Sequence, residues 1–160
     1  MERERKGEIY RRVTKEIRAT LEGETDLIAS MATIACLLHH GFDHFFWTGF
    51  YRVAAPEELL IGPYQGTLGC LHISFDRGVC GAAARREETI IVPDVHQFPG
   101  HIACDSNSKS EIVAPVFDDK GKLIAVLDVD SAEYDAFDKV DKRHLEEIVA
   151  FLRGKTTLSL

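Results

Sequence analysis

The chain has 160 residues, of which 45% are hydrophobic and 28% charged, as is usual for one globular domain. Its net charge of −7 and the mixed signs of its basic N-terminal cluster (MERERKGEIYRR) argue against binding to nucleic acid or to an anionic membrane surface. No run approaches the ~20 apolar residues of a membrane helix and the N-terminus has no signal-peptide core, so we expect a cytoplasmic protein.

Two helices are predicted at the start of the chain, over about residues 8–40. Thr25 or Asp26 is the expected N-cap of the second helix, LIASMATIACLLHH, and Gly41 would end it. Cys36 lies in that helix, where we expect a small core residue. The first helix has an apolar face of residues spaced four apart: Ile9, Val13, Ile17 and Leu21.

Three short strands are predicted next, within a region of sheet and loops that covers about residues 43–130. The first is the aromatic run HFFWTGFYRV, and the second is ELLIGPYQG, which we expect to end at Gly62 and Pro63. The third is TLGCLHISF, whose alternating pattern places Cys70 on a strand.

A short helix is predicted for RGVCGAAARREE, with Cys80 in its first turn, followed by a strand, TIIVPD, that ends at Pro93. A long irregular loop, residues 93–109, separates this strand from EIVAPVFDDKGKLIAVLDVDS. The two apolar runs of that segment flank a turn at Gly121 and therefore predict a hairpin.

The last predicted helix covers about residues 138–153, with Asp138 as N-cap and Gly154 closing it. Strands and helices do not alternate as they do in βαβ units. We therefore expect an α+β fold, with an antiparallel central sheet flanked by helices, in a single domain over residues 1–160. The buried face of the last helix is expected to contain Leu145, Ile148, Val149 and Leu152.

Three of the four cysteines, Cys70, Cys80 and Cys104, lie near loops or the ends of elements. The helix N-terminus beside Cys80 would favour its thiolate, and an inert buried thiol would be out of place in the polar loop that carries Cys104. Unreactive, scattered thiols are the plain alternative. A serine hydrolase is not indicated, since no G-x-S-x-G motif occurs. A hydrolase dyad of Cys104 with His101 rests only on two residues three apart in a loop, which is weak support.

A zinc site is a further alternative for these thiols, because histidines lie nearby in the sequence. The spacing argues against it: there is no C-x₂-C pair. We therefore expect no metal ligands and no cofactor. The residues that could have been zinc ligands are Cys70, His72, Cys80, His96, His101 and Cys104.

Carboxylates are predicted to gather at one end of the hairpin. Asp128 and Asp130 are two residues apart on a strand and so share a face, and Glu111 begins the partner strand. They could be a solvated strand end, a socket for an ammonium group, or a site that keeps one acid protonated. Trp47 and Tyr51 also share a strand face, either as core residues or as an aromatic wall of a pocket.

Four segments resemble the GAF domain of the free methionine-(R)-sulfoxide reductase family: FFWTGFYRV, RGVCGAAA, IIVPDVHQFPGHIACDSNSKSEIVAPV and GKLIAVLDVDS. The resemblance implies a GAF-like fold, a homodimer, and reduction of free methionine (R)-sulfoxide. It implies Cys104 as nucleophile, with Cys80 and Cys70 as resolving thiols. It further implies a set of substrate-binding residues: Trp47, Tyr51, Glu111, Asp128 and Asp130.

The chemistry of these residue types is consistent with that function. A neutral carboxylic acid can protonate the sulfoxide oxygen, thiolate attack leaves a sulfenic acid, and a second thiol converts it to a disulfide that a thioredoxin-type reductant reopens. The loop 93–109 would be a lid over the site. The competing interpretation is a GAF module that senses a small molecule or redox state without catalysis.

Overall fold

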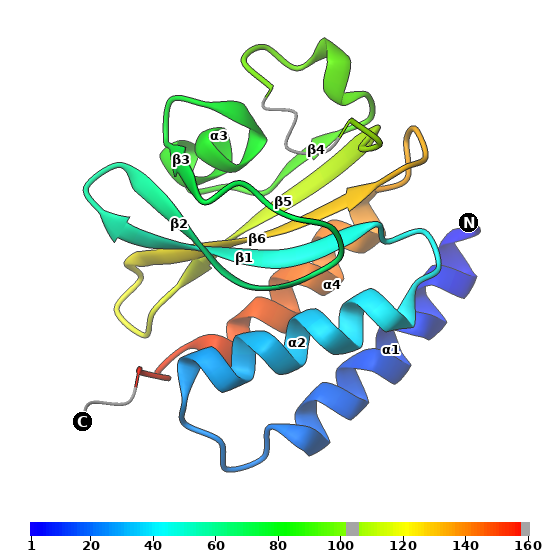
Figure 1. Cartoon of the computed structure of the whole chain (residues 1–160). Helices are drawn as coiled ribbons and strands as arrows, with labels where there is room; N and C mark the ends of the chain where they lie inside the picture. Colours follow the sequence, from blue (N-terminus) through cyan, green and yellow to red (C-terminus); the bar gives the residue numbers. More distant parts are fainter. Residues whose placement is uncertain (102–105, 158–160) are drawn as a thin grey trace.

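The computed structural model describes residues 1–101 and 106–157. Its centre is a six-stranded antiparallel sheet with the strand order β3-β2-β1-β6-β5-β4 (Figure 1). The predicted α+β class with an antiparallel central sheet is therefore confirmed. The strands are β1 (Trp47–Ala55), β2 (Glu58–Gln65), β3 (His72–Ser74), β4 (Ile90–Val92), β5 (Ser110–Phe117) and β6 (Leu123–Ser131).

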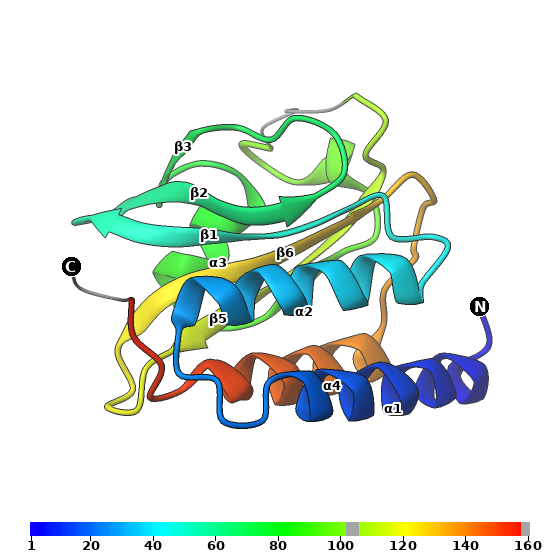
Figure 2. The same cartoon turned by 60° about the horizontal axis from the view of Figure 1, so that its bottom comes forward.

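Helices cover both faces of the sheet, but unequally. Helices α1, α2 and α4 pack on one face and the short helix α3 lies on the other, as Figures 1 and 2 show. No helix among residues 1–101 and 106–157 has the length and apolar character needed to span a bilayer. The helices are α1 (Arg3–Thr20), α2 (Leu27–Gly41), α3 (Gly78–Arg86) and α4 (Lys139–Val149), with short 3₁₀ turns at Val95–Gln97 and Ala150–Leu152.

The two faces of the sheet bury separate cores, because side chains alternate along each strand. On β6, Leu127 and Val129 point toward α1, α2 and α4, whereas Val126 belongs to the core under α3. On β5, Ile112 and Val113 divide in the same way. The alternation that fills both cores therefore also directs the intervening polar residues of β5 and β6 toward α3.

Local signals in the sequence locate most helix ends. The side chain of Asp26 accepts a hydrogen bond from the Ala29 amide at 2.7 Å and caps α2. Asp138 caps α4 through a capping box with Asp141. The first helix, however, begins at Arg3 and not near residue 8.

Three predicted details are wrong. β2 continues through Gly62 and Pro63, which lie where the β1–β2 register shifts, a position that tolerates proline. Cys70 is not on a strand, because β3 comprises only His72–Ser74. Cys36 is half-buried and lies 3.9 Å from His40 Nδ1, so it is not a core residue.

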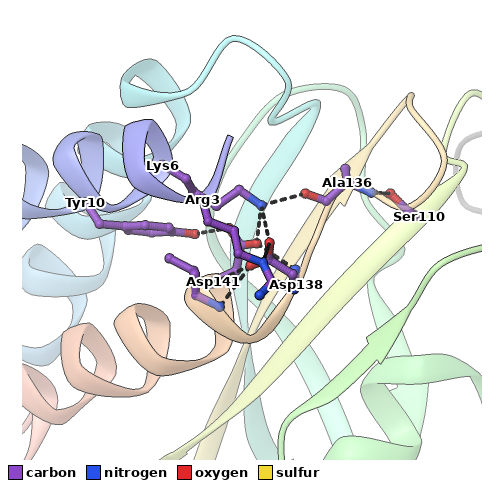
Figure 3. Close-up of polar contacts among 8 residues, drawn as sticks. Arg3, Lys6, Tyr10, Ser110, Ala136, Asp138 and Asp141 are labelled. Carbon is purple, nitrogen blue, oxygen red and sulfur yellow. Dashed lines mark hydrogen bonds and ion pairs between the residues drawn. The ribbon is translucent and has the colours of Figure 1, made fainter. Parts of the chain in front are cut away.

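A buried ion pair ties the N-terminal helix to the rest of the fold (Figure 3). Lys6 Nζ donates to Asp141 Oδ2 at 2.7 Å and to the carbonyl of Ala136 at 3.1 Å, and Tyr10 donates to Asp141 Oδ1 at 2.6 Å. The amide of Ala136 donates in turn to Ser110 Oγ at 3.3 Å. Helix α1 is thus connected through the β6–α4 loop to the first residue of β5.

Candidate active site

A cavity of about 550 Å³, including the space open at its mouth, lies between α3 and the sheet face that α3 covers. Its lining combines an aromatic side with a polar side. The polar side is formed by Cys80, His101, Ser108, Glu111, Asp128 and Asp130.

Strand register brings the three predicted carboxylates together. Glu111 on β5 is paired with Asp130 on β6, and Asp128 lies two residues before Asp130 on the same face. Glu111 and Asp128 are each only 5% exposed. Asp130 accepts a hydrogen bond from Ser108 Oγ at 2.9 Å. Three acids thus line one cavity, two of them almost fully removed from solvent.

Burial dominates the electrostatics of this acid cluster. Desolvation, followed by the charges of Asp128 and Asp130, raises the pKa of Glu111 well above its ordinary value. Desolvation also raises the pKa of Asp128, although hydrogen bonds from its neighbours partly oppose that rise. Asp128 Oδ1 is buried and has no hydrogen-bond partner among the residues that the structure describes. The cluster therefore holds protons more tightly than isolated carboxyls and leaves one buried oxygen unsatisfied.

Cys80 lies in the first turn of α3, as predicted, but it is not positioned to form a thiolate readily. It is 4% exposed, and its Sγ lies 4.0 Å from Glu111 Oε2. Desolvation and the neighbouring Asp128 and Glu111 charges raise the pKa of the Cys80 thiol well above its ordinary value. The expected lowering by the helix N-terminus is thus outweighed by burial beside two acids.

The other two candidate thiols are Cys104 and Cys70. Cys104, the predicted nucleophile, lies outside the described residues. Cys70 is disulfide-bonded and half-exposed, in the segment between β2 and β3. Among residues 1–101 and 106–157, the free cysteines are Cys36 and Cys80.

The aromatic side of the cavity is a stack of rings on β1 and β2. Trp47 and Tyr51 are nearly parallel, with centroids 5.6 Å apart, and Tyr64 stacks on the Trp47 ring at 5.1 Å. Trp47 Nε1 donates to the Thr67 carbonyl at 2.8 Å. A Cβ on Gly69 would lie 2.9 Å from Trp47 Cζ2, so this glycine lets the 66–71 segment close over the ring. Trp47 and Tyr51 line the cavity and are also buried. They are therefore both core residues and an aromatic wall of the pocket, the two alternatives that the sequence left open.

Several lining residues were not predicted as part of a substrate site, although His101 was considered as a zinc ligand and as a partner of Cys104. His101 Nε2 lies 3.9 Å from Glu111 Oε1, and burial lowers the pKa of this histidine. Arg77 stands at the edge of the cavity just before α3. The position of Arg77 next to the helix that carries Cys80 was the available signal. The sequence gives no such signal for Ser108 and Leu68, because the path of the loops brings these two residues to the cavity.

The Cys/His zinc ligands weighed from the sequence do not gather at one point among the described residues. His72 pairs with Glu58 at 2.9 Å and His96 with Asp94 at 2.9 Å, both on the surface. A different group does come together: Cys80, Glu111 and Asp128, whose ligand atoms lie within 4.8 Å of one another.

The fold corresponds to a known domain family. The family model described as GAF domain matches residues 6–153, and the chain belongs to the GAF domain family. It is 46% identical over 147 residues to GAF domain-containing protein A of Dictyostelium discoideum, covering 92% of each chain. It is 39% identical over 153 residues to the free methionine-R-sulfoxide reductase of Saccharomyces cerevisiae, covering 92% of this chain and 85% of that protein.

A solved structure gives the same relationship. The free methionine-R-sulfoxide reductase of Neisseria meningitidis, in complex with its substrate, superposes with a TM-score of 0.87 at 44% identity. The superposition covers 92% of this chain and 87% of that one. The chain is thus closely related, over nearly its full length, to free methionine-R-sulfoxide reductases.

Proposed function

We propose that this protein reduces free L-methionine (R)-S-oxide to methionine by thiol chemistry. Its relationship to free methionine-R-sulfoxide reductases supports the reaction. The observation that carries the proposal is the cluster of three carboxylates lining the cavity, with the buried Asp128 Oδ1 unsatisfied by any described residue. Such a cluster needs a cationic hydrogen-bond donor, and a free amino acid supplies one in its ammonium group.

The same cluster explains selection for the free amino acid. An ammonium group donates three charge-assisted hydrogen bonds, which Asp128 and Asp130 are placed to accept. A methionine sulfoxide within a peptide offers an amide instead and would leave buried carboxylate oxygens unpaired. An unpaired buried acceptor costs about 1–3 kcal/mol, and more when it is charged. Arg77 at the cavity edge is suited to the substrate carboxylate.

The aromatic side suits the other end of the substrate. Trp47 and Tyr51 present apolar ring surface beside the acids, and the methyl group of the sulfoxide would lie against it. A chiral sulfoxide bound with its methyl on the rings and its oxygen toward Glu111 presents one face of the sulfur. This arrangement accounts for discrimination between the two epimers.

Glu111 is the proposed general acid. Its raised pKa keeps the carboxyl protonated where an isolated glutamate is ionised, so it can give a proton to the sulfoxide oxygen. Asp128 and Asp130 then remain for the ammonium group. His101, whose Nε2 lies 3.9 Å from Glu111 Oε1, is close enough to exchange protons with that carboxyl through one water molecule.

The thiols complete the reaction. Cys104 attacks the sulfur, methionine leaves, and the sulfoxide oxygen remains on Cys104 as a sulfenic acid. Cys70 then condenses with it, releasing water and forming a disulfide that a thioredoxin-type dithiol reduces. The disulfide-bonded state of Cys70 supports it as the main resolving thiol. Cys80, buried and with a raised pKa, is the slower second resolving thiol.

Two further features belong to the proposal. The loop 93–109 is a lid: the carbonyl of Gly100 accepts from the Gly78 amide at 2.9 Å, so the loop is attached to the start of α3. The working form is a homodimer, which size-exclusion chromatography with light scattering would detect.

The deciding experiment is turnover of the purified protein with each epimer of free methionine sulfoxide, using dithiothreitol and then a thioredoxin system as reductant. We expect turnover of the R epimer only, and none with Cys104→Ser. Cys36→Ser is the matched control, because this thiol lies on α2, and it should retain wild-type rates. Absence of turnover, or equal turnover of both epimers, would favour a sensory GAF module and overturn the proposal.

A further inference from the structure

Three unlike ligand atoms converge on the polar side of the cavity. Cys80 Sγ and one carboxylate oxygen each of Glu111 and Asp128 all lie within 4.8 Å of one another. The Cys80 sulfur is 4.0 Å from Glu111 Oε2. Around a tetrahedral zinc ion, a Zn–S bond of about 2.3 Å and a Zn–O bond of about 2.1 Å place the sulfur and the oxygen about 3.6 Å apart, so small side-chain rotations would bring these atoms to coordination distance.

The second observation is the unsatisfied oxygen of Asp128. Its Oδ1 is buried in a residue only 5% exposed and lacks a hydrogen-bond partner among the described residues. It belongs to a residue that lines the cavity, so an ion entering from the mouth can reach it. An ammonium group would also satisfy this oxygen, whereas a metal ion would in addition use the Cys80 sulfur beside it as a ligand.

The sulfur ligand selects the kind of ion. Magnesium and calcium take oxygen ligands, whereas a thiolate with two carboxylates suits a borderline ion such as zinc. Three protein ligands leave the fourth tetrahedral position to water. This donor set differs from the Cys/His combinations weighed from the sequence, since two of its three members are carboxylates.

We propose that the cavity also binds one zinc ion through Cys80, Glu111 and Asp128, and that zinc and the sulfoxide substrate exclude each other. The exclusion rests on the proposed function, because it assumes that the ammonium group of the substrate uses the same carboxylates. Zinc binding itself does not depend on that function. Zinc would thus be a competitive inhibitor of the site and not its cofactor.

The direct test is calorimetric titration of the wild-type protein with zinc chloride, with Cys70 kept in its disulfide and no added thiol. Keeping that disulfide prevents the Cys70 thiol from adding a ligand. We expect one ion per chain and no comparable heat with magnesium chloride. Cobalt chloride should give a thiolate-to-metal absorption band in the near ultraviolet.

Variants separate this site from surface binding. Cys80→Ser and Asp128→Asn should each weaken zinc binding by at least about tenfold, and Cys80→Ser should remove the cobalt band. Cys36→Ser is the matched control, a free thiol beside His40, and should change neither. Circular dichroism and thermal unfolding check that each variant is folded. Binding that survives Cys80→Ser but is lost in Cys36→Ser would overturn the proposal, as would no binding at all.

Exclusion is measured with the fluorescence of Trp47, the single tryptophan of the chain. Added (R)-sulfoxide should change this emission, and saturating zinc should raise the apparent dissociation constant in proportion to zinc concentration. Zinc affinity that is unaffected by saturating sulfoxide would overturn the exclusion. If zinc binds as expected but the sulfoxide does not bind at all, the metal site stands and the proposed function fails. The reverse result would reject the metal site alone.

Discussion

The part of the chain that the structure describes contains two buried acid clusters, and they differ in whether a cation and hydrogen-bond donors accompany the acids. Asp141, fully buried, accepts hydrogen bonds from Lys6 Nζ at 2.7 Å, Tyr10 at 2.6 Å and the Asp138 amide at 2.8 Å (Figure 3). Asp128 is nearly as buried, but its Oδ1 has no partner among the described residues and acids surround it. One cluster contains its own cation, and the other is incomplete without a ligand.

The difference separates acids that stabilise the fold from acids that recognise a ligand. A buried carboxylate is tolerable when a cation and hydrogen-bond donors replace its lost hydration. The Asp141 cluster meets this condition by itself, so it holds α1, α4 and the β6–α4 loop together. The Glu111 and Asp128 cluster meets it only in part, by retaining protons, and would meet it fully when an ammonium group or a metal ion enters.

The largest expected effect comes from breaking the complete cluster. Lys6→Met should lower the free energy of unfolding by about 3–5 kcal/mol, because it leaves the Asp141 carboxylate buried without its cation. Urea unfolding followed by circular dichroism measures this. Arg3→Met is the matched control on the same helix: its side chain is 77% exposed and lies 3.6 Å from Asp138. An exposed pair is worth less than about 1 kcal/mol, so equal losses in the two variants would contradict the comparison.

Substitution in the incomplete cluster should have the opposite effect on stability. Asp128→Asn removes an ionisable group whose burial is unfavourable, so the free energy of unfolding should rise by about 1 kcal/mol at neutral pH. Substrate affinity should fall about 10- to 100-fold, because a charge-assisted hydrogen bond worth roughly 1.5–3 kcal/mol is lost. Unfolding and fluorescence titration of the same preparation measure both quantities. If the variant is less stable but keeps its substrate affinity, Asp128 stabilises the fold, as Asp141 does, and does not bind the substrate.

The sequence predicts the incomplete cluster better than the complete one. Strand periodicity alone puts Asp128 and Asp130 on one face, and the hairpin returns them to Glu111, so local rules suffice. Burial of Lys6 has no such signal. Lys6 stands in a charged run that reads as solvated, and its partner Asp141 is 135 residues away.

Loop structure is also poorly predicted from the sequence, because it too depends on contacts with residues distant in the chain. The pattern around Cys70 alternates as a strand would, but the chain there folds over Trp47, where Gly69 permits the close approach. The burial that raises the pKa of Cys80 also comes from distant residues, on β5 and β6. The helix position of Cys80 was a local property and was predicted, whereas its reactivity depends on tertiary packing.

A third effect, smaller in size, is the pH dependence of stability that Glu111 contributes. Its pKa in the folded state is raised above the ordinary value of 4.5, so the folded protein holds the proton more tightly than the unfolded chain. The resulting stabilisation is complete below about pH 4.5 and is lost as the pH rises through the folded-state pKa. Glu111→Gln should therefore gain stability relative to wild type between about pH 5 and pH 8.

Unfolding of both proteins across this range isolates the Glu111 contribution, because the other titrating groups are shared. A stability difference that does not change with pH would mean that Glu111 is ionised in the folded protein. Glu111 would then help to bind the ammonium group, together with Asp128 and Asp130, and would not be the proton donor. Glu8→Gln, on the exposed surface of α1, is the matched control for replacing a glutamate by a glutamine.

The smallest expected effect tests whether the two clusters act independently. A hydrogen-bonded path runs between them, from Lys6 Nζ to the Ala136 carbonyl and from the Ala136 amide to Ser110, the neighbour of Glu111. The charges that shift the Glu111 pKa come from Asp128 and Asp130 and do not include Lys6. The losses and gains of Lys6→Met and Glu111→Gln should therefore add within about 0.5 kcal/mol in the double variant. A larger coupling, removed when Ser110→Ala is added, would mean that helix α1 helps to position the acid of the site.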